Sequence, residues 1–98
     1  MFQAQAGHNS KNLEAYMVSL SIRRRLAQID PSNIQWRRDE ACILNRIGDE
    51  YRSVGMNYQA IAAYEGSVAI RSQLAKIDPR NRQRQLDVSM GLKKLNSR

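Results

Sequence analysis

Two side chains able to do nucleophilic or metal chemistry stand out because each is alone of its kind: His8 and Cys42. A protein zinc site normally needs three or four ligands, and these residues supply at most two. Cys42 has no second histidine to activate it, and no glycine-rich phosphate loop is present. We therefore expect no catalytic residue, no metal site and no cofactor, and we predict that the chain is not an enzyme.

Basic side chains form the larger chemical feature. Sixteen Lys and Arg stand against nine Asp and Glu, which gives a net charge of +7. Residues 71–98 hold eight basic and two acidic side chains. Such an imbalance favours acidic partners. We predict a basic patch on the last helix, made of Arg80, Arg82, Arg84 and Lys94.

Composition places the chain among globular proteins, with 42% hydrophobic and 26% charged residues. Ninety-eight residues suit one domain. One cysteine allows no disulfide within the chain, and the first ten residues do not resemble a secretory signal. No stretch has the length and apolar character of a membrane span. We expect a cytoplasmic protein that does not bind membranes.

The chain also repeats itself with a period of 48 residues. Residues 22–33 (IRRRLAQIDPSN) align without a gap with residues 70–81 (IRSQLAKIDPRN). When residues 12–50 are laid on 60–98, fourteen positions are identical. A fold built from a repeated unit follows from this pattern.

Each copy carries the periodicity of a helix. Apolar and small residues step by three and four positions, which returns them to one side of a helix. The first copy has Asn12, Ala15, Ser19, Ile22, Leu26 and Ile29, and the second has Ala60, Ala63, Ser67, Ile70, Leu74 and Ile77. Arg23 and Arg71 also recur, and we expect them to pair with Asp39 or Asp87.

Breaks between the helices recur as well. A proline disfavours helical geometry in the residue before it, so Asp30-Pro31 and Asp78-Pro79 each end a helix. Ser32 or Asn33, and later Asn81, can cap the next helix, and Gly55 can stop one. The pattern predicts four helices in antiparallel hairpins, with residues 1–10 as a flexible leader and 11–98 as one domain. The expected helices are 12–29, 34–54, 57–77 and 82–96.

Residues 44–64 resemble the tetratricopeptide motif, in which small residues let two helices touch and aromatic residues fill holes between hairpins. The matching residues are Leu44, Ile47-Gly48, Tyr51, Gly55, Tyr58, Ala60 and Tyr64. Ser67 stands where the motif prefers a small residue. The resemblance implies an all-α, right-handed solenoid of about four helices that binds a protein or peptide.

The 48-residue period exceeds the 34 residues of the standard repeat, so both helices are expected to be about two turns longer. This is similar to the long-helix tetratricopeptide-like repeats common in bacterial proteins. Residues 12–29 match a second helix without its first, and residues 82–96 match a first helix without its second. Since such arrays usually need about three stacked repeats, we expect a homo-oligomer through the open helical ends, or attachment to a larger array.

In repeats of this kind the first helix of each hairpin lines a groove for a partner. The positions that the resemblance assigns to the groove are Cys42, Asn45, Asp49, Arg52, Ser53, Met90 and Lys93. Asn45 would bond the backbone of an extended peptide, and Arg52 and Lys93 would hold a carboxylate. The alternative interpretation is that these are ordinary solvated side chains.

Two other functions stay open. A basic nucleic-acid-binding domain would rest on charge alone, because the last helix has no aromatic residue to stack a base. A self-associating repeat fragment is the other. A protein-interaction module remains the first hypothesis.

Overall fold

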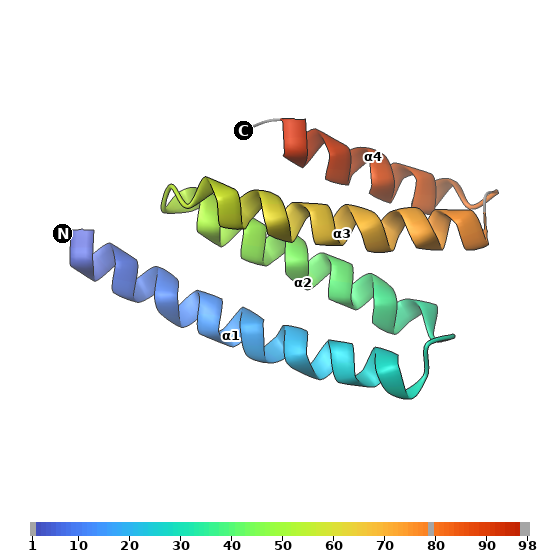
Figure 1. The fold of residues 1–98 in the computed structure, drawn as a ribbon, viewed down its shortest axis with the longest axis horizontal. Coiled ribbons are helices and arrows are strands. Elements are labelled where there is room, and N and C mark those ends of the chain that lie inside the picture. Colours follow the sequence, from blue (N-terminus) through green and yellow to red (C-terminus); the bar gives the residue numbers. More distant parts are fainter. Residues whose placement is uncertain (1, 79, 97–98) are drawn as a thin grey trace.

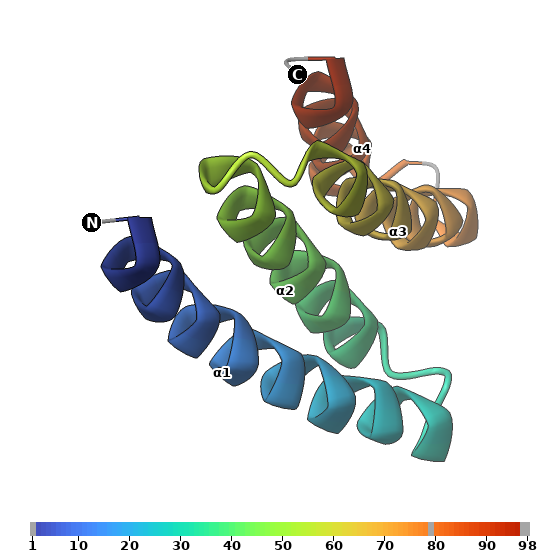
Figure 2. The same ribbon diagram turned by 60° about the vertical axis from the view of Figure 1, so that its left-hand side comes forward.

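Four helices make up the regular structure of the residues described here. The computed structural model describes residues 2–78 and 80–96, with side chains for 12–78 and 80–95. Consecutive helices pack as antiparallel neighbours, so that α1 contacts α2, α2 contacts α3, and α3 contacts α4 (Figures 1 and 2). The helices are α1 (Phe2–Ile29), α2 (Ile34–Ser53), α3 (Asn57–Ile77) and α4 (Arg82–Asn96). The predicted all-α class and the antiparallel hairpins are thereby confirmed.

The turns before α2 and α4 use equivalent asparagines as caps. Asn33 Oδ1 accepts a hydrogen bond from the backbone N of Trp36 at 3.1 Å. Asn81 Oδ1 accepts from the backbone N of Gln83 at 3.0 Å and of Arg84 at 3.4 Å. These bonds satisfy amides that the first turn of a helix leaves unpaired. Asn81 was predicted as a cap, and of the two candidates Ser32 and Asn33 it is Asn33 that caps α2; the predicted start of each helix is confirmed.

Gly55 ends α2 as expected. Its φ of +81° lies in the left-handed region that favours glycine. The backbone N of Met56 donates to the carbonyl of Tyr51 at 2.9 Å, and that of Gly55 donates to Arg52 at 3.0 Å. This pair of bonds is the Schellman arrangement, which satisfies the last carbonyls of the helix. The helix itself ends at Ser53, one residue before the expected bound.

The first helix begins earlier than predicted. It starts at Phe2 instead of residue 12, so residues 2–10, expected as a flexible leader, continue the helix. The sequence before residue 12 contains no proline and only one glycine, Gly7, so no strong helix breaker stands there.

The core lies mainly between α2 and α3 and extends to α1. Its buried members are Leu20, Ala41, Leu44, Ile47, Ala63, Ile70 and Leu74. Ser67 is also fully buried, and Tyr64 is only 2% exposed. The stripe that the sequence predicted on α3 is thus buried from Ala60 to Leu74, on the side of the helix that packs against α2, whereas its last member, Ile77, is 62% exposed.

Candidate functional site

Side chains from three helices meet at the carboxylate of Asp49. Lys94 of α4 places its Nζ 2.9 and 3.0 Å from the two carboxylate oxygens. The hydroxyl of Tyr64, on α3, donates to Asp49 Oδ1. Arg52 Nη2, one turn along α2, lies 3.9 Å from the same oxygen. The cations of Arg52 and Lys94 also lie 5.7 and 5.6 Å from the centre of the Tyr64 ring, within cation–π range.

This cluster changes the acidity of two groups. Partial burial raises the pKa of Asp49, but the hydrogen bonds from Tyr64 and Lys94 and the charges of Lys94 and Arg52 outweigh it, so the pKa is lowered. Burial, the hydrogen bond to Asp49 and the charge of that carboxylate raise the pKa of Tyr64 to about 12. Asp49 is therefore ionised and Tyr64 is neutral near neutral pH.

Gly48 positions Tyr64 for this contact. A Cβ atom at Gly48 would lie 2.5 Å from Tyr64 Cε1. With no side chain at this position, the ring lies directly against the backbone of α2, and its hydroxyl reaches Asp49 on the same helix. The motif that pairs Gly48 with Tyr64 in the sequence is thus a close helix contact in the structure.

A second cluster joins α2 and α4 at Asp87. Arg38 Nη2 lies 3.1 Å from Asp87 Oδ2, and Gln83 Nε2 donates to Oδ1 at 2.9 Å. In the first copy of the repeat, Gln35 Nε2 donates to Asp39 Oδ1 at the same distance. The expectation that Arg23 or Arg71 binds these carboxylates is wrong. Arg38 lies nearer to Asp87 across the helices, and Arg71 donates to Cys42 Sγ at 3.6 Å instead.

The residues predicted to line a groove lie on α2 and α4, and we call them the α2–α4 surface: Cys42, Asn45, Asp49, Arg52, Ser53, Met90 and Lys93. Cys42, Arg52, Ser53, Met90 and Lys93 are exposed. Asn45 is half-buried, and its Oδ1 has no hydrogen-bond partner among the described residues. Ser53 Oγ donates to the Glu50 carbonyl of its own helix at 2.8 Å. Of these residues, Asp49 and Arg52 are brought together.

The predicted basic patch is divided between the two ends of α4. Arg84 Nη1 donates at 3.2 Å to the Leu74 carbonyl in the last turn of α3, which also accepts from the backbone N of Asp78. Lys94, ten residues further along, belongs to the Asp49 cluster. Ten residues of helix span about 15 Å. Arg80 and Arg82 are exposed at the beginning of α4.

Sequence reasoning missed Tyr64, Arg38 and Lys94 as members of these clusters. The signal for Gln35–Asp39 and Gln83–Asp87 was present, because both pairs recur at the period with helical spacing of four. No such signal marks Lys94–Asp49, because the contact depends on how three helices pack.

Neither a metal site nor a membrane span is found in the part of the chain that the structure describes. Among those residues, no three His, Cys, Asp or Glu side chains are grouped so that they could hold a metal ion. No described helix combines the length and apolar character needed to cross a bilayer. His8 lies outside the residues whose side chains are described.

No protein-family model, curated protein or solved structure matches it. Fold and site therefore define the protein by its architecture: an all-α domain of four sequential, antiparallel helices, with α2 and α4 linked by side chains.

Proposed function

We propose that this chain is a protein-interaction module of the tetratricopeptide-like type, a short right-handed solenoid that docks a peptide or helix of a partner protein on the α2–α4 surface. The observation that carries the proposal is the linkage of α2 to α4. Lys94–Asp49 and Arg38–Asp87 hold together two helices that α3 separates in the chain. The groove positions of successive hairpins then belong to one continuous surface.

An acidic segment is the partner that suits this surface. Lys93 of α4 is exposed, Arg52 of α2 is exposed although it also contacts Asp49 at 3.9 Å, and the chain as a whole carries a net charge of +7. A carboxylate of the partner would pair with these cations, while exposed Met90 offers an apolar contact beside Lys93. Such binding should weaken as salt is added, because salt screens the attraction.

Nucleic-acid binding has less support. Of the four residues in the predicted basic patch, Arg84 is bonded to a backbone carbonyl and Lys94 to Asp49. The remaining two, Arg80 and Arg82, sit at one end of α4. A nucleic-acid surface would need cations spread along the path of the phosphates.

The test compares two variants that each remove two positive charges. Arg52→Gln/Lys93→Gln alters the α2–α4 surface, and Arg80→Gln/Arg82→Gln alters the beginning of α4. Each is used beside the wild type to capture proteins from the native lysate, and bound proteins are identified by mass spectrometry. The proposal expects a protein that the wild type and the second variant retain and the first variant loses at least about tenfold.

Equal loss from both variants would contradict the proposal, because only net charge would then matter. Recovery of nucleic acid in place of protein, lost on nuclease treatment and equally reduced in both variants, would favour the nucleic-acid alternative.

A further inference from the structure

Equivalent positions of the repeat have very different exposure in this structure. Ile70 of α3 is 8% exposed, whereas its counterpart Ile22 of α1 is 52% exposed. Leu44 of α2 is 7% exposed, whereas its counterpart Leu92 of α4 is 46% exposed. Ile70 and Leu44 belong to the core between α2 and α3. The same apolar residues therefore recur on α1 and α4 without the neighbour that covers them in the middle of the chain.

A shift of 48 residues along the chain relates two of the three helix contacts to each other and leaves the third without an equivalent. Helix α1 corresponds to α3, and α2 corresponds to α4, so the α1·α2 contact is the counterpart of α3·α4. Leu20 of α1 is buried against α2, and its counterpart Val68 lies against Gly91 of α4, where an added Cβ would be 2.8 Å from Val68 Cγ2. The α2·α3 contact has no such counterpart within the chain. Its missing equivalent is a contact of α4 with α1.

One chain cannot make that contact, because α2 and α3 lie between α1 and α4 (Figures 1 and 2). We propose that the contact forms between two copies: the outer face of α4 (Gln85, Ser89 and Leu92) docks on the outer face of α1 (Ala15, Ser19, Ile22, Arg25 and Leu26) of the next copy. This names a second copy of the chain as a partner and uses faces other than the proposed peptide surface.

A hydrogen bond of the internal interface supports this register. Arg37 Nη2 of α2 donates to Gln73 Oε1 of α3. The counterparts of these residues are Gln85 on α4 and Arg25 on α1. Donor and acceptor have exchanged helices, so the same bond forms between copies with Arg25 as donor and Gln85 as acceptor.

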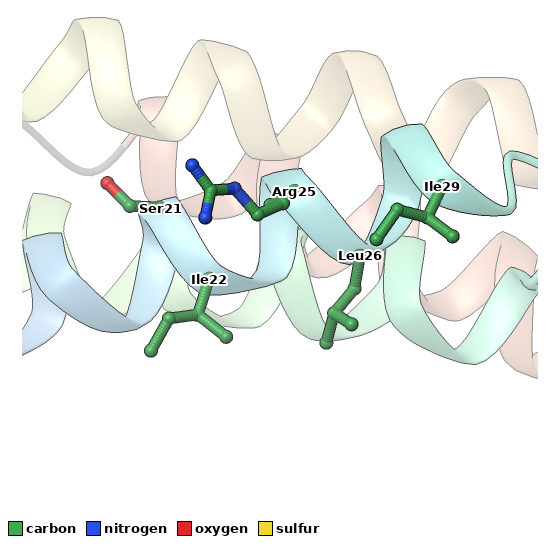
Figure 3. A pocket seen from close by; sticks show the side chains of 5 residues that line it. All are labelled: Ser21, Ile22, Arg25, Leu26 and Ile29. Atoms are coloured by element: carbon green, nitrogen blue, oxygen red, sulfur yellow. The ribbon is translucent and has the colours of Figure 1, made fainter.

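The outer face of α1 is also hollowed at this place. A pocket is lined by Ser21, Ile22, Arg25, Leu26 and Ile29. Figure 3 shows Ile22 and Leu26 pointing to the same side from successive turns of α1. Their counterparts, Ile70 and Leu74, are buried against α2. Leu92 of the second copy, the counterpart of Leu44, is the side chain that would cover this hollow.

Association of this kind is open-ended. The two faces differ, so each added copy leaves one α1 face and one α4 face uncovered. Since each copy carries a net charge of +7, repulsion opposes contact between copies, and salt should strengthen the association by screening it. The opposite response is expected for an acidic peptide on the α2–α4 surface.

At one position the proposed contact between copies is more crowded than the α2·α3 contact within the chain. Gly66 of α3 faces Leu44, and a Cβ there would lie 3.3 Å from Leu44 Cδ1. Its counterpart on α1 is Val18, which is 61% exposed. The branched side chain of Val18 crowds Leu92 of the docked copy. Val18→Ala should therefore tighten association, although it removes apolar surface.

The test uses Ile22→Glu, which blocks the α1 face, and Leu92→Glu, which blocks the α4 face. Both residues are exposed, so each variant should keep the wild-type helical circular dichroism and melting temperature. Each variant alone should stay at the 11.3 kDa monomer mass in sedimentation velocity at high micromolar concentration. An equimolar mixture should form a dimer that does not grow, because each variant contributes its one unblocked face to the contact and only blocked faces are left exposed.

A mixture that stays monomeric would overturn the inference. So would dimers of Leu92→Glu alone, which indicate a symmetric α1–α1 contact, or dimers of Ile22→Glu alone, which indicate an α4–α4 contact. Arg52→Gln, which touches the proposed peptide surface and neither outer face, should assemble as the wild type does. If Arg52→Gln loses a captured partner protein and still assembles, the peptide surface and the contact between copies are shown to be separate.

Discussion

The interface between α2 and α3 and the outer faces of α1 and α4 use nearly the same residues in different surroundings. Ile70, Leu74 and Leu44 are buried in the first. Ile22 and Leu92, the counterparts of Ile70 and Leu44, are about half exposed in the second. The side chain alone therefore does not determine burial in a repeat; the presence of the next helix does.

Removing the apolar side chain at matched positions should give the largest difference. Ile70→Ala opens a cavity in the α2·α3 core and should lower the free energy of unfolding by about 2–5 kcal/mol. Ile22→Ala removes the same atoms from an exposed position and should change it by at most about 0.5 kcal/mol. Urea denaturation at low micromolar concentration, where association between copies is weakest, measures both. Equal losses would show that the outer face of α1 is already covered within one chain.

Replacing Gly48 or Gly66 by alanine should lower stability at the first position, where the helices are in tight contact, and leave it nearly unchanged at the second. Alanine at Gly48 would place its Cβ 2.5 Å from the Tyr64 ring, which is itself buried. The strain should lower the free energy of unfolding by about 1–3 kcal/mol.

The control is Gly66→Ala, whose Cβ meets only the end of the Leu44 side chain at 3.3 Å. The gain of about 1 kcal/mol in helix propensity should offset that contact, so stability stays near that of the wild type. If Gly48→Ala is as stable as Gly66→Ala, the close approach of Tyr64 to α2 is wrong.

Replacing the buried serine of α3 should stabilise the protein. Ser67 is 0% exposed, and its Oγ has no hydrogen-bond partner among the described residues. Ser67→Ala removes the cost of burying that hydroxyl and should raise the free energy of unfolding by about 1 kcal/mol. Ser19→Ala, at the equivalent half-buried position of α1, should gain only the smaller helix propensity, about 0.5 kcal/mol. A loss of stability in Ser67→Ala would indicate that the hydroxyl makes a bond.

The Asp49 cluster should give the smallest effect, seen as a dependence on pH. The pKa of Asp49 is lowered in the folded state, so its stabilising contribution is present above its ordinary value of 3.8. This contribution is lost as the pH falls through the folded pKa. The stability difference between the wild type and Asp49→Asn should therefore shrink as the pH falls from 5 to about 2.

The contribution of Tyr64 to stability changes with pH in the opposite direction, at high pH. Its raised pKa means that its contribution is complete below its ordinary value of 10.0 and is lost as the pH rises through about 12. Absorbance titration of the phenols in the wild type and in Tyr64→Phe would locate this group. A Tyr64 that titrates at 10 would contradict the hydrogen bond to Asp49.

The helices were largely predictable because single residues determine where most of them begin or end. Asn33, Asn81 and Gly55 each act within a few positions along the chain, so the starts of α2, α3 and α4 were correct. The start of α1 at Phe2 was missed, although no strong helix breaker stands among the leading residues. Local signals thus located helices where a cap or a breaker exists and failed where neither does.

The clusters were harder to predict because they depend on packing across helices. Lys94 reaches Asp49 over 45 positions of sequence, and Arg38 reaches Asp87 over 49. The contact between Tyr64 and Gly48 was closer to prediction, because the motif names both residues. The motif did not indicate that the Tyr64 hydroxyl donates a hydrogen bond to Asp49.

We infer that α1 and α4 each expose one half of an interface. The complete counterpart of that interface is the contact between α2 and α3 within the chain. The most direct measurement is the mean mass of the wild type by light scattering, from low to high micromolar concentration and at two salt concentrations. We expect a mass that rises past twice the 11.3 kDa of one chain without a plateau, and rises further in high salt. A constant monomer mass with cooperative unfolding, or a plateau at the dimer, would contradict it.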